Sequence, residues 1–290
     1  MFTATLIADP ARAPLDPAAA TALRDAWGGG ALRWLAPRTA AEFDAAAVPA
    51  GAWDHWRGLQ GLGVDLCWQP AAGRQKRLLL ADMDSTMIGQ ECIDELADLA
   101  GVGPEVAAIT ARTMAGELDF EGALRARVAL LAGLPEAAVA EVLATRITYT
   151  PGGATLIATM RARGAWTALV SGGFTAFTGP VAAHLGFDEH RANTLVVAGG
   201  RLTGRVAEPI LGRAAKAAAL AEIAARLRID PAAAMAVGDG ANDLAMLAAA
   251  GAGVALHAKP AVQAEARLRV NHGDLTALLY LQGIPAADFA

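Results

Sequence analysis

The sequence predicts an α/β protein with a doubly wound parallel sheet, and three short apolar runs carry this prediction. They span residues 78–81, 167–170 and 235–237, and each ends in a polar or glycine-rich turn followed by a helical pattern. Strands that alternate with helices in this way form parallel sheets with helices on both faces. Ligands of such sheets bind beyond the carboxyl ends of the strands, so we expect the three turns to meet in one crevice.

A small N-terminal domain of mixed α+β structure is expected at residues 1–75. Five of the six tryptophans lie in this stretch, which sets it apart from the rest of the chain. We interpret it as a packing or regulatory module without chemistry of its own. The larger core would then comprise residues 76–87 and 149–290.

Residues 88–148, between the first and second apolar runs, carry no strand signal and are predicted to form a helical cap inserted over the crevice. Asp119 suits the N-cap position of one of its helices. Further along, residues 194–206 alternate around Gly199 and Gly200, which predicts a hairpin with a two-residue turn.

The overall composition narrows the class of protein. The net charge of −5 includes no basic tract, which argues against nucleic acid or anionic lipid as the main partner. The longest nearly uncharged stretch, residues 244–256, is too short and glycine-rich to cross a membrane, so we expect a soluble protein. With only Cys67 and Cys92 and no recognisable secretory signal, a reducing cytoplasm is the simplest location.

Two acids one residue apart, Asp82 and Asp84, directly follow the first apolar run. The ordinary explanation is that Asp84, Ser85 or Thr86 caps a helix and faces solvent. A chemical explanation uses both carboxylates: one attacks phosphorus to form an aspartyl phosphate, and the other protonates the leaving oxygen. Oxygen ligands in the same loop would also suit Mg²⁺.

The other two turns favour the chemical explanation. The second run leads into Ser171-Gly172-Gly173, whose hydroxyl and backbone N–H groups suit phosphate oxygens. The third leads into Gly238-Asp239-Gly240-Ala241-Asn242-Asp243, which adds two acids for a metal shell. Lys216 opens a long helical pattern, where its cation would point toward the crevice, although a single lysine is ordinarily a solvated surface residue.

The motifs DMDST, SGG, a downstream lysine and GDGANDLAM resemble the four motifs of the haloacid dehalogenase superfamily of phosphotransferases. The stretches IGQECIDELADLAG, TARTMAGELDFEGALRARVALLAG and GVALHAKPAV are similar to its phosphoserine-hydrolysing members, and the likeness covers roughly residues 77–283. The resemblance implies a Rossmann-like core with a cap. It also implies Mg²⁺-dependent hydrolysis of O-phosphoserine through an aspartyl phosphate, the last step of serine biosynthesis.

The resemblance also implies a role for each motif residue. Asp82 is the nucleophile, and Asp84 is the general acid and base. Mg²⁺ is held by the Asp82 carboxylate, the Asp84 backbone carbonyl and Asp239, with Asp243 supporting this shell. The phosphate is held by Ser171, Gly172, Lys216 and Asn242. The segment before the lysine, EPILGRAAK, departs from the usual family form.

Substrate choice depends on the helix after Asp119. At about 100° per residue, Arg127 lies within roughly 60° of the apolar stripe of this helix, whereas Arg125 lies over roughly 100° away. Arg127 is therefore either a snorkelling arginine or, as the resemblance implies, a clamp for the substrate carboxylate. Glu91 would take the substrate ammonium, unless it is an ordinary first-turn glutamate. Met114 and Phe120 would wall the pocket, although core packing alone also explains them.

Other functions remain open at this level. The same chemistry could act on phosphothreonine or transfer the phosphoryl group to another hydroxyl. A regulatory protein with an inactive core is a rival from another class, although every expected catalytic residue type is present. A metal-independent route through phosphohistidine is disfavoured because no histidine lies near the motifs. The sequence is compatible with a monomer or a homodimer.

Overall fold

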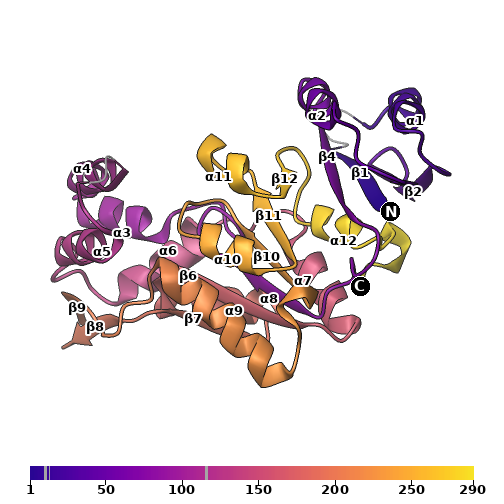
Figure 1. Ribbon diagram of the computed structural model, residues 1–290. Helices are drawn as coiled ribbons and strands as arrows, with labels where there is room; N and C mark the ends of the chain where they lie inside the picture. Colours follow the sequence, from indigo (N-terminus) through magenta and orange to yellow (C-terminus); the bar gives the residue numbers. More distant parts are fainter. Residues whose placement is uncertain (10–11, 13, 115–116) are drawn as a thin grey trace.

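The computed structural model describes residues 1–9, 12, 14–114 and 117–290. Its elements form three parts (Figure 1). A parallel sheet with its helices lies in the centre, the helices of the insertion lie at one end, and the N-terminal sheet with its two helices lies at the other.

The central sheet has six parallel strands in the order β12-β11-β10-β5-β6-β7. From edge to edge they are β12 (Leu268–Val270), β11 (Ala252–Leu256), β10 (Ala234–Gly238), β5 (Leu78–Ala81), β6 (Trp166–Phe174) and β7 (Glu189–Asn193). The chain leaves β5 for β6 on one side and later returns to β10 on the other. The order therefore reverses at β5, and the crevice beyond its carboxyl end is the expected ligand site.

Helices cover both faces of this sheet because each strand alternates its side chains between them. In β5, Leu79 and Ala81 join one buried apolar cluster while Leu78 and Leu80 join another, and all four are fully buried. The first cluster packs against α7 (Gly153–Ala162), α8 (Thr175–Leu185) and α12 (Ala277–Leu281). The second packs against α9 (Arg213–Leu227), α10 (Leu244–Ala249) and α11 (Pro260–Glu265). Short 3-10 turns follow at Pro231–Ala233 and Ala286–Asp288. The predicted fold class is confirmed.

The insertion between β5 and α7 is helical, as predicted. It contains α3 (Cys92–Ala100), α4 (Gly103–Met114), α5 (Phe120–Ala129) and α6 (Ala137–Thr145). Asp119 caps α5, since its carboxylate accepts a 2.7 Å hydrogen bond from the backbone N–H of Gly122. We refer to these four helices as the cap.

The predicted hairpin is also confirmed. It consists of β8 (Leu195–Ala198) and β9 (Arg201–Val206). Gly199 and Gly200 between them have φ angles of 57° and 72°, the left-handed conformation that this kind of two-residue turn requires. Leu202 exchanges backbone hydrogen bonds with Gly133 and Leu134, so the hairpin supports the connection between α5 and α6.

The N-terminal part is a four-stranded antiparallel sheet with two helices. Its elements in chain order are β1 (Phe2–Ala8), α1 (Pro17–Ala26), β2 (Arg33–Ala36), β3 (Ala40–Ala45), α2 (Ala52–Gln60) and β4 (Val64–Pro70), with sheet order β2-β3-β1-β4. This is the βαββαβ arrangement of ferredoxin-like folds. Buried Asp65 joins it to the core, because its carboxylate accepts backbone hydrogen bonds from Asn271, His272 and Gly273 at 2.8 to 3.0 Å.

Both cysteines, Cys67 and Cys92, are free and buried. In the described ranges, no helix combines the length and apolar character needed to cross a membrane. The division of the chain at residues 75, 87 and 148 stays a prediction.

Candidate active site

The three predicted turns meet at the carboxyl edge of the central sheet. The Ser171 hydroxyl donates to Asp84 Oδ2 at 3.4 Å, which joins the ends of β5 and β6. The Thr86 hydroxyl donates to Asp239 Oδ1 at 3.1 Å, which joins the ends of β5 and β10. The expectation that the three segments meet at one edge of the sheet is therefore confirmed.

Lys216 lies in the first turn of α9, and its side chain points into this crevice, as expected. Its Nζ lies 2.7 Å from Asp82 Oδ1 and 2.6 Å from Asp243 Oδ1, and the side chain is 1% exposed. Burial alone would lower the pKa of Lys216, but the two carboxylates outweigh it and raise the pKa above its ordinary value. The ammonium therefore stays charged.

Asp82 has one engaged and one open oxygen. Its Oδ1 accepts from Lys216 Nζ and from the backbone N–H of Met83 at 2.8 Å. Within the described part of the chain, no hydrogen bond or ion pair falls on Oδ2. One oxygen is thus oriented by a cation and an amide, while the other is available to a ligand.

Asp84 is in a different electrostatic state from an ordinary surface acid. Desolvation raises its pKa to about 6; the nearby charge of Asp82 adds to this rise, and a hydrogen bond from Cys92 opposes it. The Cys92 backbone N–H, at the start of α3, donates to Asp84 Oδ1 at 3.1 Å. A carboxyl group with a pKa near neutrality can both give and take a proton, which suits general acid and base chemistry.

Asp82, Asp239 and Asp243 form a cluster of like charges. One carboxylate oxygen from each lies within 4.8 Å of the others. Burial is the main cause that raises the pKa of Asp239 and of Asp243, and the charge of Asp82 adds to both rises. Lys216 neutralises one charge only. A divalent cation with oxygen ligands would relieve the remaining repulsion, so the residues fit such an ion.

The members of this cluster are not equally free to bind an ion. Asp243 uses Oδ1 for Lys216 and Oδ2 for the backbone N–H of Gly240, at 3.0 Å. Asp239 uses Oδ1 for Thr86. Asp82 and Asp239 therefore each keep an oxygen for a cation, and Asp243 is the member that holds Lys216.

The Ser171-Gly172-Gly173 segment requires its glycines for close approach. A methyl group added at Gly173 would lie 2.7 Å from Asp84 Oδ2, and one added at Gly172 would lie 3.1 Å from Phe120 Cζ. The sequence placed the end of the strand at Val170, which is wrong. The strand β6 continues to Phe174, with a shift of register against β7 that lets the glycines stay extended at the crevice.

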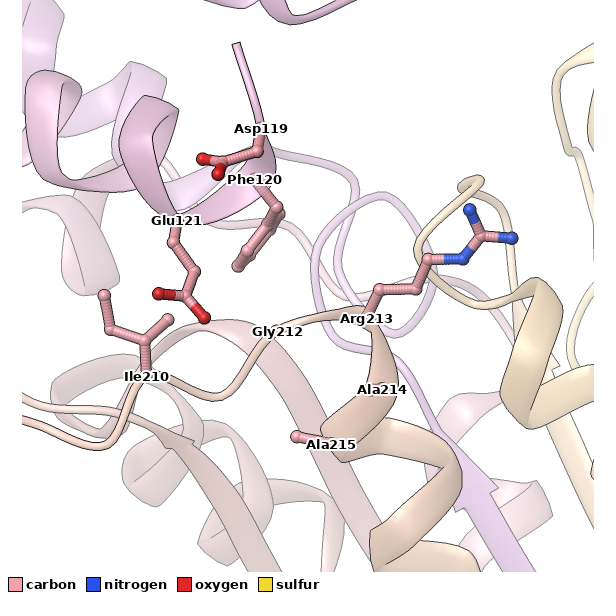
Figure 2. A pocket seen from close by; sticks show the side chains of 8 residues that line it. All are labelled: Asp119, Phe120, Glu121, Ile210, Gly212, Arg213, Ala214 and Ala215. Carbon is pink, nitrogen blue, oxygen red and sulfur yellow. The ribbon is translucent and has the colours of Figure 1, made fainter.

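Phe120 reaches from the cap to the core. Its ring faces Gly172 and also Gly212, where an added methyl group would lie 3.3 Å from Phe120 Cδ1. Beside it lies a pocket of about 360 Å³ (Figure 2), between the start of α5 and the start of α9. Phe120 points into this pocket, while Arg213 points away from it. None of the clustered acids lines this pocket, so it is distinct from the acid cluster.

The two arginines of α5 differ as the helix geometry predicts. Arg125 is exposed and forms ion pairs with Glu121 at 3.2 Å and Glu208 at 2.8 Å. Arg127 is half-buried and has no carboxylate within ion-pair distance in the ranges that the structure describes; its Nε donates to the carbonyl of Ala123 at 3.4 Å. Arg127 thus remains available to an anionic ligand.

The other cap-side and loop residues occupy the following places. Glu91 is the N-cap residue of α3, and its Oε1 accepts a hydrogen bond from the Ser85 hydroxyl at 2.7 Å. Desolvation and the charge of Asp84 raise its pKa to about 7. Asn242 is half-buried in the turn after β10. Met114 ends α4, and its side chain lies outside the described part of the structure.

Sequence reasoning missed two residues of the crevice. Thr86 was considered only as a helix cap, yet it is fully buried and orients Asp239. The sequence did offer one indication of this role, since Thr86 lies two positions after Asp84 in the same loop. Asn193, at the end of β7, bonds to the backbone of both Gly172 and Leu211, and no local pattern marks it.

A doubly wound sheet with a carboxylate pair, a buried lysine and an acidic cluster that could hold a cation at its carboxyl edge is typical of α/β proteins that hydrolyse phosphate esters. The chain belongs to the haloacid dehalogenase-like hydrolase family, whose model matches residues 79–248. Members of this family generally use a divalent metal ion.

Individual relatives are similar over most of the chain. A phosphoserine phosphatase of Streptomyces coelicolor is 49% identical over 226 residues, which are 77% of this chain and 55% of that protein. A phosphoserine phosphatase of Albidiferax ferrireducens is 47% identical over 210 residues, 71% of this chain and 89% of that protein. The crystal structure of a HAD family hydrolase from Salmonella enterica superposes with a TM-score of 0.86 at 30% identity, covering 97% of this chain and 98% of that one.

Proposed function

We propose that the protein hydrolyses O-phosphoserine to serine and phosphate with Mg²⁺ as its cofactor, as the last step of serine biosynthesis. The observation that carries the proposal is the asymmetric acid pair. Asp82 is oriented by Lys216 with one oxygen open, and Asp84 beside it has a pKa of about 6. The names of the relatives from Streptomyces coelicolor and Albidiferax ferrireducens support the same substrate.

In the first step, the Asp82 carboxylate attacks phosphorus and the bond between phosphorus and the serine oxygen breaks. The electron pair of that bond stays on the serine oxygen, which takes a proton from Asp84. The products are free serine and an aspartyl phosphate at position 82. Lys216 and the backbone N–H of Met83 hold Asp82 Oδ1, so the carboxylate is oriented before the substrate arrives.

In the second step, Asp84 removes a proton from water as the water oxygen attacks phosphorus. The bond between phosphorus and Asp82 breaks, and its electron pair restores the Asp82 carboxylate. The cycle consumes one water molecule and leaves Asp84 protonated for the next substrate. The pKa of about 6 lets the same group act as acid and then as base near neutral pH.

The carboxylates of Asp82 and Asp239, with the backbone carbonyl of Asp84, would hold Mg²⁺. When bound, this ion neutralises charge on the phosphate oxygens. Asp243 supports the shell by holding Lys216 and the turn at Gly240. Ser171, Gly172, Lys216 and Asn242 would bind the phosphate group.

The remaining groups of the substrate would meet the cap. Arg127, half-buried and without an ion pair among the described residues, would bind the carboxylate, and Glu91 would bind the ammonium. Phe120, which already faces Gly172, would wall the pocket with Met114. The cap would thereby exclude bulk water from the acid pair. A reducing cytoplasm suits the two free cysteines.

The test compares two arginines of one helix. Arg127→Ala should lower kcat/KM for O-phosphoserine by about 10- to 100-fold, because a hydrogen bond to a charged group contributes about 1.5–3 kcal/mol. It should change p-nitrophenyl phosphate turnover little, since that substrate has no carboxylate at this position. Arg125→Ala is the matched control, because its exposed ion pairs contribute little.

Equal losses on both substrates would contradict the assignment of Arg127. Phosphate release from O-phosphoserine and phosphothreonine, with and without a chelator, tests the substrate and the metal. Asp82→Asn should abolish release from every substrate, because the amide cannot act as the nucleophile.

A further inference from the structure

Asn193 is a buried amide that connects two segments of the crevice. It is the last residue of β7 and is 2% exposed. Its Nδ2 donates to the Gly172 carbonyl at 2.8 Å and to the Leu211 carbonyl at 3.2 Å. Its Oδ1 accepts from the Leu211 backbone N–H at 2.6 Å. The side chain is therefore held from three directions.

The first connection reaches Asp84. The Gly172 carbonyl and the Gly173 N–H belong to one peptide group, and this N–H donates to Ser171 Oγ at 2.9 Å. Because a peptide group is planar, holding its carbonyl also sets the direction of its N–H. The Ser171 hydroxyl in turn donates to Asp84 Oδ2 at 3.4 Å. Asn193 is thus the outer end of a hydrogen-bond chain that ends on the proton-transfer group.

The second connection reaches Asp82. Leu211 immediately precedes Gly212, the N-cap of α9, and Lys216 is the fourth residue of that helix. Two hydrogen bonds from one side chain fix both backbone groups of Leu211, and hence the point at which α9 starts. Since a helix turn is rigid, this point sets where Lys216 Nζ meets Asp82.

We infer that Asn193 is a positioning residue for phosphoryl transfer, which aligns the Gly172–Gly173 peptide and the start of α9 against the acid pair. It acts on the phosphate end of the substrate and touches no reacting atom. The inference rests on the proposed function for the identity of the substrate. The hydrogen bonds of Asn193 lie beside the residues that would bind the phosphate group, which every phosphate ester shares.

Asn271 offers a matched control. Its Nδ2 also donates two hydrogen bonds, to Gln60 at 2.7 Å and to Gln263 at 3.1 Å. These partners lie on α2 and α11, away from the acids. Each amide donates two side-chain hydrogen bonds, and Asn193 also accepts one, but only Asn193 connects to the crevice.

The experiment compares Asn193→Ala with Asn271→Ala in the full chain with Mg²⁺. The first variant should lose about 100-fold in kcat on both O-phosphoserine and p-nitrophenyl phosphate, because a displacement of about 1 Å is enough for such a loss. Its inhibition constant for inorganic phosphate should rise about 10-fold. Asn271→Ala should stay within about twofold of the parent in all three measurements.

Asn193→Asp provides a second variant if the alanine protein does not fold. It keeps the acceptor for the Leu211 N–H but loses the donor to the carbonyls of Gly172 and Leu211, so the same losses are expected. Turnover within about twofold of the parent in either variant overturns the inference, as does a loss confined to O-phosphoserine or shared by Asn271→Ala. If the parent hydrolyses p-nitrophenyl phosphate but not O-phosphoserine, the proposed substrate is wrong, and the comparison of the asparagines still stands.

Discussion

Replacing Lys216 by methionine should destabilise the folded protein strongly when no divalent ion is present. Lys216 is the cation between Asp82 and Asp243, with contacts of 2.7 and 2.6 Å, and is 1% exposed. Methionine fills a similar volume, so the main effect is electrostatic. Leaving a buried charge without its partner costs about 3–5 kcal/mol, which corresponds to a fall in Tm of about 10 °C for a chain of this size.

The stability lost in Lys216→Met should depend on pH in a direction that follows from the pKa of Asp243. Burial and the charge of Asp82 already raise the pKa of Asp243, and Lys216 opposes the rise. Without Lys216 the folded-state pKa moves further above the unfolded value. A carboxyl group with a raised folded pKa destabilises the fold when ionised and ceases to do so as it protonates. The deficit of Lys216→Met relative to the parent should therefore be largest at about pH 8 and shrink toward about pH 5.

Thermal unfolding in a chelating buffer measures this deficit. Lys259→Met replaces an exposed lysine and serves as the control, with little expected change. Lys216→Met leaves the carboxylates of Asp82 and Asp243 without their cation. Adding Asp243→Asn removes one of these two charges and should recover part of the lost stability. The reasoning would be refuted if Lys216→Met melted within about 1 °C of the parent at about pH 8. It would also be refuted if the difference in Tm between the two proteins grew as the pH was lowered.

Three further predictions concern the metal, the substrate and the N-terminal sheet. The KM for O-phosphoserine should rise as the pH falls below about 7, because burial and neighbouring carboxylates raise the pKa of Glu91 to about 7 and its protonated form cannot pair with an ammonium. Glu91→Gln should abolish this dependence. Thr86→Val frees Asp239 Oδ1 and should weaken metal affinity about 10-fold, measured as the ion concentration that raises Tm. Asp65→Asn should lower the free energy of unfolding by about 2 kcal/mol in urea, since a charged acceptor of the backbone at residues 271–273 is lost.

Each of these has a clear contrary outcome. The role of Glu91 would be contradicted if the KM of the parent for O-phosphoserine did not change with pH. It would also be contradicted if the KM for p-nitrophenyl phosphate rose in the same way as the pH fell. Unchanged metal affinity in Thr86→Val would show that Asp239 needs no such orientation. An Asp65→Asn protein with parental stability would mean that the N-terminal sheet is held mainly by apolar packing.

The features that were predictable from the sequence are those that depend on neighbouring residues. The apolar run of β5, the Asp119 cap and the Gly199-Gly200 turn each lie within a few positions, where side-chain alternation, capping and backbone freedom act locally. The meeting of the three turns was also predictable, because parallel strands bring their carboxyl ends to one edge. Arg127 could be separated from Arg125 because the helical period determines which one lies near the apolar stripe.

Contacts between distant segments were decided by the tertiary structure. Thr86 and Asp239 are 153 positions apart, and Asp65 and Gly273 are 208 apart, so no local pattern relates them. The extension of β6 past Val170 depends on pairing with β7, and the amide of Asn193 finds its partners only when that edge strand lies beside Gly172 and Leu211. The physical reason is that a hydrogen-bonding side chain has many possible partners in the sequence. Burial selects among them only after the sheets and helices have packed.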